Sequence, residues 1–66
     1  MIGHVITLVR DKGFGFIKGE DNLEYFFHYS ALDDSVRFDD LKVGDRMEFE
    51  ESKSAKGPRA EEVTRR

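Results

Sequence analysis

The stretch that most constrains the fold of this chain is residues 12–18, Lys-Gly-Phe-Gly-Phe-Ile-Lys. Successive side chains of an extended strand point to opposite faces, so Phe14, Phe16 and Lys18 share one face and Ile17 lies on the other. Ile17 is the natural core residue, which leaves two phenylalanines and a lysine directed outward. Flat rings beside a cation suit stacked bases and a phosphate chain.

The opposite orientation would put both phenylalanines in the core, where aromatic side chains are usually found. A second stretch, residues 25–29 (Tyr-Phe-Phe-His-Tyr), argues against it. Five consecutive rings cannot all enter the core of a 66-residue chain, so at least one face should present rings to solvent. A glycine inside a strand weakens it, so Gly15 makes sense if backbone or a ligand must come close at this position. The expected outward face consists of Phe14, Phe16, Phe26 and His28, with Lys12 and Lys18 at its margin.

These two stretches resemble the paired ribonucleoprotein motifs of the cold-shock domain family. The resemblance covers nearly the whole chain, from Gly3 and Val5 to Pro58 and Val63. It implies a small five-stranded barrel that binds single-stranded RNA or DNA, acting as a cytoplasmic bacterial RNA chaperone or in transcription and translation control. The family positions that contact nucleic acid match Lys12, Phe14, Phe16, Phe26, His28, Tyr29, Phe38 and Lys56.

The first strand departs from the family pattern. The family usually carries Lys-Trp-Phe-Asn where this chain has Ile6, Thr7, Leu8 and Val9. A phosphate contact and a stacking partner are therefore missing, which predicts weaker binding. The alternative function is a protein-interaction module on the same barrel with reduced affinity for nucleic acid.

The rest of the chain predicts further short strands. Apolar and β-branched patterning favours strands at 2–9, 14–19, 24–29, 46–51 and 59–64, with a bend or bulge at Gly3. Met47, Phe49, Ala60 and Val63 are the expected core residues of the last two strands. Together these features predict one domain over residues 1–66, an all-β, five-stranded antiparallel barrel of OB type.

The connections carry further candidates. We expect one helical turn at 30–32 capped by Ser30, a long acidic loop at 33–44 and a flexible loop at 52–57. Phe38 in the acidic loop either packs back onto the barrel or stacks on a base, and the family resemblance favours stacking. Arg59 is a further candidate for contact with a nucleic acid strand.

Composition excludes several functions. The chain has no cysteine, which rules out disulfides and thiolate metal sites, and no apolar run long enough to span a membrane. Two histidines make a zinc site improbable, and His28 with Ser30 has no evident third catalytic group. We therefore expect no cofactor, no small-molecule substrate and no enzyme activity. A cytoplasmic monomer is expected, with a strand-swapped dimer left open.

The formal net charge of −3 hides an uneven distribution. Residues 20–51 hold eleven acidic and three basic side chains, whereas residues 52–66 hold five basic and two acidic ones. One face can therefore be locally positive on an acidic protein.

Overall fold

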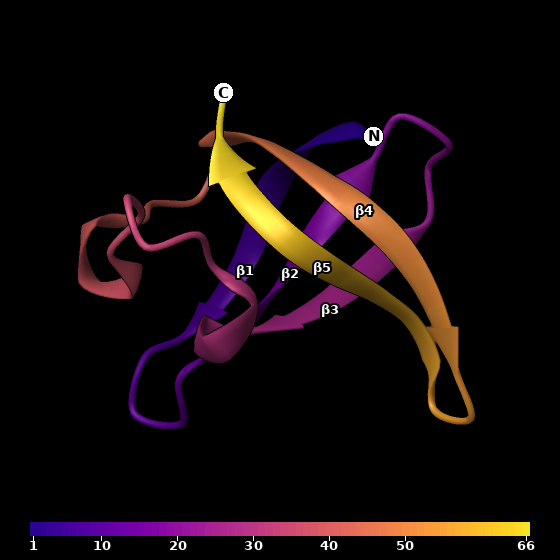
Figure 1. The fold of residues 1–66 in the computed structure, drawn as a ribbon, viewed down its shortest axis with the longest axis horizontal. Helices are drawn as coiled ribbons and strands as arrows, with labels where there is room; N and C mark the ends of the chain where they lie inside the picture. Colours follow the sequence, from indigo (N-terminus) through magenta and orange to yellow (C-terminus); the bar gives the residue numbers. More distant parts are fainter.

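Five strands make up the barrel in the computed structural model, which describes residues 1–66 (Figure 1). They are β1 (Ile2–Val9), β2 (Phe14–Gly19), β3 (Glu24–His28), β4 (Arg46–Ser54) and β5 (Gly57–Arg65). Two 3₁₀ turns, η1 (Tyr29–Ala31) and η2 (Phe38–Asp40), lie in the long connection between β3 and β4. No helix of the chain has the length and apolar character needed to cross a membrane.

The strands close in the order β1-β2-β3-β5-β4, which confirms the predicted all-β barrel. All neighbouring strands run antiparallel except β3 and β5, which pair in parallel through Phe26 and Arg59. Strand direction cannot alternate all the way around a ring with an odd number of strands. One parallel contact is therefore unavoidable, and in this barrel it lies beside the aromatic face.

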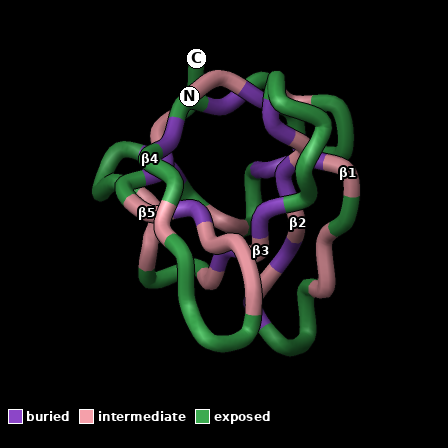
Figure 2. The backbone as a smooth tube through the Cα atoms, turned by 90° about the vertical axis from the view of Figure 1, so that its right-hand side faces the viewer, coloured by how far each residue is buried: buried purple, intermediate pink, exposed green.

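The core follows the alternation predicted from the sequence. Ile17 of β2 and Tyr25 and Phe27 of β3 are buried, while their neighbours along each strand are only partly covered. Figure 2 shows buried and more exposed stretches interspersed along the tube. The expected core residues of β4 and β5 are confirmed, and the loop between β3 and β4 adds two more. The buried hydrophobic residues are Val5, Ile17, Tyr25, Phe27, Val36, Leu41, Met47, Phe49, Ala60 and Val63.

The bulge in β1 lies at Ile6 rather than at Gly3, where a bend or bulge was predicted, so the bulge of that prediction was wrong. Val5 pairs with Ile17 and Thr7 pairs with Phe16, which leaves Ile6 as the extra residue. A bulge shifts the phase of side-chain alternation, so Val5 is buried whereas Thr7, two residues later, is exposed. Gly3 is required for another reason, because a Cβ there would collide with the carbonyl oxygen of Lys18.

Gly15 allows β1 and the core to approach β2 closely. A Cβ at this position would lie 2.5 Å from the carbonyl oxygen of Thr7 and 2.9 Å from Cε1 of Phe27. Both distances are shorter than van der Waals contact, so no larger side chain fits without a shift of the backbone. The glycine between the two outward phenylalanines therefore serves backbone packing, one of the two roles expected for it.

Three predicted boundaries need correction. Strand β3 ends at His28, so Tyr29 belongs to η1, and the His28 side chain rather than Ser30 caps that turn by accepting from the Ser30 backbone N–H. The loop expected at 52–57 is shorter, because β4 continues to Ser54 and β5 begins at Gly57. Antiparallel pairing of Ser54 with Gly57 keeps this connection tight.

A buried phenol links the β2–β3 loop to β4. The Tyr25 hydroxyl lies 2.6 Å from Oδ2 of Asp21 and 2.9 Å from Oε2 of Glu51. Asp21 also accepts from the backbone N–H of Leu23 at 3.1 Å. The hydrogen bond from Tyr25 is the main cause of a lowered pKa for Asp21, and the same contact raises the pKa of Tyr25.

The lowered pKa of Asp21 predicts a specific loss of stability in acid. A carboxyl group whose pKa is lower in the folded protein stabilises the fold above its unfolded value, 3.8, and that contribution disappears as the pH falls through the folded value. Asp21→Asn should lower the melting temperature at pH 7, and the difference from the parent should shrink below about pH 3.8. Melting curves at pH 7 and pH 3 test this, with Asp34→Asn as a control of equal charge change. Equal melting of the Asp21 variant and the parent at pH 7 would refute it.

Candidate nucleic-acid interface

Three phenylalanines form a cluster on the outer surface of β2 and β3. Phe16 pairs with Phe26 and Phe14 pairs with His28 across the two strands. The ring centroids of Phe14 and Phe26 are 5.3 Å apart, those of Phe16 and Phe26 5.9 Å, and those of Phe14 and Phe16 6.2 Å. All are only half-buried. We call Phe14, Phe16, Phe26 and His28 the aromatic platform.

His28 is oriented by hydrogen bonds to η1. Its Nδ1 accepts from the backbone N–H of Ser30 at 3.3 Å and lies 2.9 Å from the Ser30 hydroxyl. In the neutral ring this arrangement leaves the proton on Nε2. The ring also lies against Tyr29, with centroids 4.3 Å apart. The pairing of His28 with Ser30 thus caps a turn, which accounts for their proximity without any catalytic role.

A hollow at one end of the platform gathers three of the predicted site residues. Lys12, Tyr29 and Phe38 line a space of about 500 Å³ together with Arg10, Asp11, Gly13, Arg37 and Asp39. Tyr29 is 56% exposed. Phe38 is half-buried and packs against the core, 6.3 Å from the ring of Phe27. Phe38 therefore lies apart from the platform rings. It packs back onto the barrel, one of the two alternatives considered for it, and stacking on a base stays a prediction.

A second hollow, of about 320 Å³, lies at the end of the platform toward the β4–β5 turn. Its walls include Phe16 and Phe26 on one side and Lys56 and Arg59 on the other. The guanidinium carbon of Arg59 is 5.1 Å from the centroid of the Phe26 ring, a cation–π contact. The fold thus places Lys56 and Arg59, which lie far from Phe16 and Phe26 in the sequence, beside these two rings.

A family model described as the 'Cold-shock' DNA-binding domain matches residues 1–66, the whole chain. The chain belongs to this family. The predicted resemblance is therefore confirmed, and the OB-type barrel with it. Members of the cold-shock family are nucleic-acid-binding proteins rather than enzymes, which agrees with the expectation that this chain has no enzyme activity.

Several bacterial cold shock proteins resemble the chain over most of its length. It is 43% identical over 61 residues to Cold shock protein 1 of Lactiplantibacillus plantarum, covering 92% of this chain and 91% of that protein. It is 44% identical over 62 residues to Cold shock-like protein CspE of Escherichia coli, covering 92% and 88%. The Major cold shock protein of Micrococcus luteus is 40% identical over 65 residues, covering 97% and 96%.

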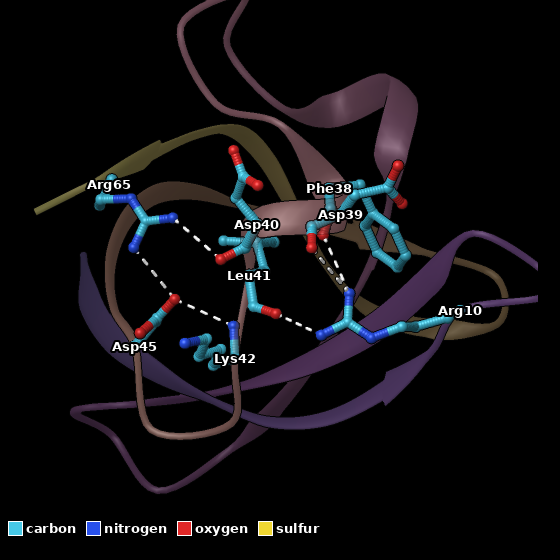
Figure 3. Close-up of polar contacts among 8 residues, drawn as sticks. All are labelled: Arg10, Phe38, Asp39, Asp40, Leu41, Lys42, Asp45 and Arg65. Atoms are coloured by element: carbon cyan, nitrogen blue, oxygen red, sulfur yellow. Dashed lines mark hydrogen bonds and ion pairs between the residues drawn. The ribbon is translucent and has the colours of Figure 1, made fainter.

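The contacts that Arg10 makes in this cold-shock domain were not predicted from the sequence. Its Nη2 donates to the carbonyl oxygen of Leu41 at 2.5 Å, and its Nη1 lies 3.3 Å from that of Asp39 and 3.4 Å from that of Phe38 (Figure 3). Arg10 therefore fastens η2, which carries Phe38, to the β1–β2 turn. No local pattern could reveal this, since the accepting carbonyls lie about thirty positions further along the chain.

Lys18 lies at one end of a row of basic side chains that runs outward from the platform. It pairs with His4 of β1, and His4 pairs on its other side with Arg46 of β4. These three residues line a hollow of about 620 Å³ that also includes Arg66. The sequence did not predict this row, because the β1–β4 pairing brings Arg46 out of the acidic middle segment.

Four acidic side chains gather in another hollow. Asp33 and Asp34 line a separate hollow with Glu61 and Glu62, beside η1 and β5. Glu62 contacts the carboxyl group of Glu50, and this contact raises the pKa of Glu62. The fold therefore places one acidic cluster away from the platform, whereas Asp11 and Asp39 lie in the same hollow as Lys12.

Proposed function

We propose that this cold-shock domain binds single-stranded RNA or DNA with little sequence preference, by stacking bases on the aromatic platform. The observation that carries the proposal is the cluster of three half-exposed phenylalanines, with centroids 5.3–6.2 Å apart, on the outer face of β2 and β3. Side chains of this kind normally enter the core, and each base stacked on such a ring contributes about 1–3 kcal/mol.

Basic side chains around the platform support the same function. Lys12 lies in the hollow at one end, Lys56 and Arg59 in the hollow at the other, and Lys18 follows Phe16 on the same face of β2. If the bases of a single-stranded nucleic acid stacked on the rings, its phosphates would pass close to these basic side chains. Rings that compete with base–base stacking would hold strands open, so we place the domain as an RNA chaperone or a regulator of transcription or translation. It would act as a cytoplasmic monomer without a cofactor.

Salt dependence is the first test of this function. We expect about three to four phosphate contacts, made by Lys12, Lys18, Lys56 and Arg59. The logarithm of the affinity should therefore fall by about 2–3 for each tenfold increase in salt concentration. Fluorescence anisotropy with a short labelled pyrimidine-rich strand, titrated at several salt concentrations, measures this slope. Lys12→Gln should reduce the slope by about 0.7, whereas Lys42→Gln, in the loop before β4, should leave it unchanged.

A flat salt response would contradict the phosphate contacts. It would favour the alternative function, a protein-interaction surface on the same barrel, because apolar protein contacts do not release counterions. Absence of binding to any single strand at low salt would reject the proposed function altogether.

Thr7 offers a gain-of-function test. It is exposed and pairs directly with Phe16, at the position that carries tryptophan in the resemblance noted above. Thr7→Trp should add a flat ring beside the platform and tighten binding by about 1 kcal/mol or more. The melting temperature should change little, because the new ring would lie on solvated surface.

The Thr7→Trp variant also supplies its own reporter, since the chain has no tryptophan. Its fluorescence should be quenched when a base stacks on the new ring. A well-folded variant with unchanged affinity and unquenched emission would show that this face is not used for stacking.

A further inference from the structure

Arg59 differs from the other arginines in how it is held. Arg10, Arg65 and Arg66 all donate hydrogen bonds to backbone or carboxylate oxygens, and Arg37 and Arg46 are exposed to solvent. The guanidinium of Arg59 instead lies 5.1 Å from the Phe26 centroid, and its Nε is 3.7 Å from Oε1 of Glu61. This Nε is buried and has no hydrogen-bond partner.

The buried Nε is out of reach of a ligand, but the terminal nitrogens of Arg59 are not buried and make no hydrogen bond within the chain, so they can donate to an acceptor in the hollow. The side chain of Arg59 keeps 38% of its surface exposed and lines the hollow that Phe16 and Phe26 also line. A flat ligand group stacked on Phe16 in that hollow would bring one edge to the guanidinium.

The other polar groups of this hollow are already engaged. The Ser54 hydroxyl donates to the carbonyl oxygen of Gly57 at 3.0 Å and accepts from the backbone N–H of Lys56 at 3.3 Å. Pro58 has no backbone N–H to offer. The Lys56 ammonium is a mobile point charge suited to phosphate, whereas the planar fork of Arg59 has a fixed direction. Base discrimination in this hollow therefore rests on Arg59.

We propose that Arg59 selects guanine at one base position, at this end of the platform, an inference that rests on the proposed function and adds one preferred position to otherwise sequence-tolerant binding. Guanine presents two adjacent acceptors, O6 and N7, which match the two parallel donors of a guanidinium. Adenine places a donor beside N7, and the N3–H of thymine or uracil separates its two carbonyl oxygens. Each of these bases would leave one donor of Arg59 unpaired. Glu61 orients the guanidinium and keeps it over Phe26.

The test compares labelled heptamers of thymidine that carry one central guanine, adenine, cytosine or 7-deazaguanine, with the all-thymidine heptamer as the reference. The guanine strand should bind about 5- to 150-fold more tightly than the adenine strand, the usual discrimination of a bidentate arginine contact. The 7-deazaguanine strand lacks the N7 acceptor and should lose most of that advantage. Cytosine, whose O2 and N3 also form an acceptor pair, distinguishes guanine selection from general acceptor selection.

Substitutions of Arg59 test whether the preference for guanine depends on its guanidinium. Arg59→Lys keeps the charge and Arg59→Gln keeps a donor, but both should reduce the guanine-to-adenine affinity ratio to near one. Lys56→Gln should weaken all strands alike and preserve the ratio. Circular dichroism of each variant checks that the barrel is intact. The comparison of the four bases on the unsubstituted protein tests the preference even if a variant fails to fold.

Three outcomes would overturn the proposal: equal binding of guanine and adenine strands, binding of the cytosine strand at least as tight as that of the guanine strand, or a guanine preference that survives in both Arg59 variants. Each of these differs from failure of the proposed function, in which the all-thymidine strand itself would not bind.

Discussion

Replacing Phe16 with alanine should weaken binding of a single strand by about 1–3 kcal/mol, the value of one stacked base. The ring lies at the centre of the outer face, with Thr7 opposite it on β1 and Phe26 opposite it on β3. It is half-buried, and its packing partners are the other two platform rings. Its removal should therefore cost about 1–2 kcal/mol of folding free energy, from the lost burial of half a ring and the lost aromatic contacts, which is less than removal of a core ring costs.

Anisotropy titration and thermal melting of the Phe16→Ala variant, measured on the same preparation, separate these two effects. Binding should fall while a cooperative unfolding transition remains. If the variant instead lost most of its stability and kept its affinity, Phe16 would be a core residue and the outward orientation of β2 would be wrong.

Replacing Phe27 with alanine should have the opposite result. This ring is fully buried, packs near Phe38 and lies against Gly15. A phenylalanine-to-alanine change in a core costs about 3–5 kcal/mol. A domain of this size has a total stability of only roughly 3–10 kcal/mol, so the variant should lose about a third of its stability or more.

Urea unfolding followed by circular dichroism measures the loss. The matched control is Phe26→Ala, which changes the adjacent residue on the other face of the same strand and should retain a cooperative transition. A Phe27→Ala variant that melts like the parent would mean that β3 presents its other face to the core. The two neighbouring phenylalanines thus test the orientation of the strand from both sides.

The orientation of β2 and β3 could be predicted from the sequence because it depends on local alternation. In a strand the side-chain period is two, and Ile17, Tyr25 and Phe27 are buried where that period places them. Five adjacent rings exceed what a small core can accept, so the outward face had to carry some of them. The same local argument correctly assigned Met47 and Phe49 to the core of β4.

Local alternation could not determine which face of β1 the Thr7 side chain occupies. The bulge at Ile6 reverses the alternation between Val5 and Thr7, and it arises from the pairing of β1 with β2 rather than from any residue type in β1. Gly3, the residue that local reasoning favours for a bulge, instead makes room for the Lys18 carbonyl. Register between strands is a property of the assembled sheet.

The remaining parts of the interface were decided by contacts between segments that are far apart in the sequence. Arg59 reaches Phe26 only because β3 and β5 form the single parallel pair. Arg46 joins Lys18 through β1, and Arg10 holds the loop of Phe38 through carbonyl groups that any residue could supply. Periodicity within a strand determines which side chains face outward. Closure of the barrel determines which of them become neighbours, because that depends on register and strand order.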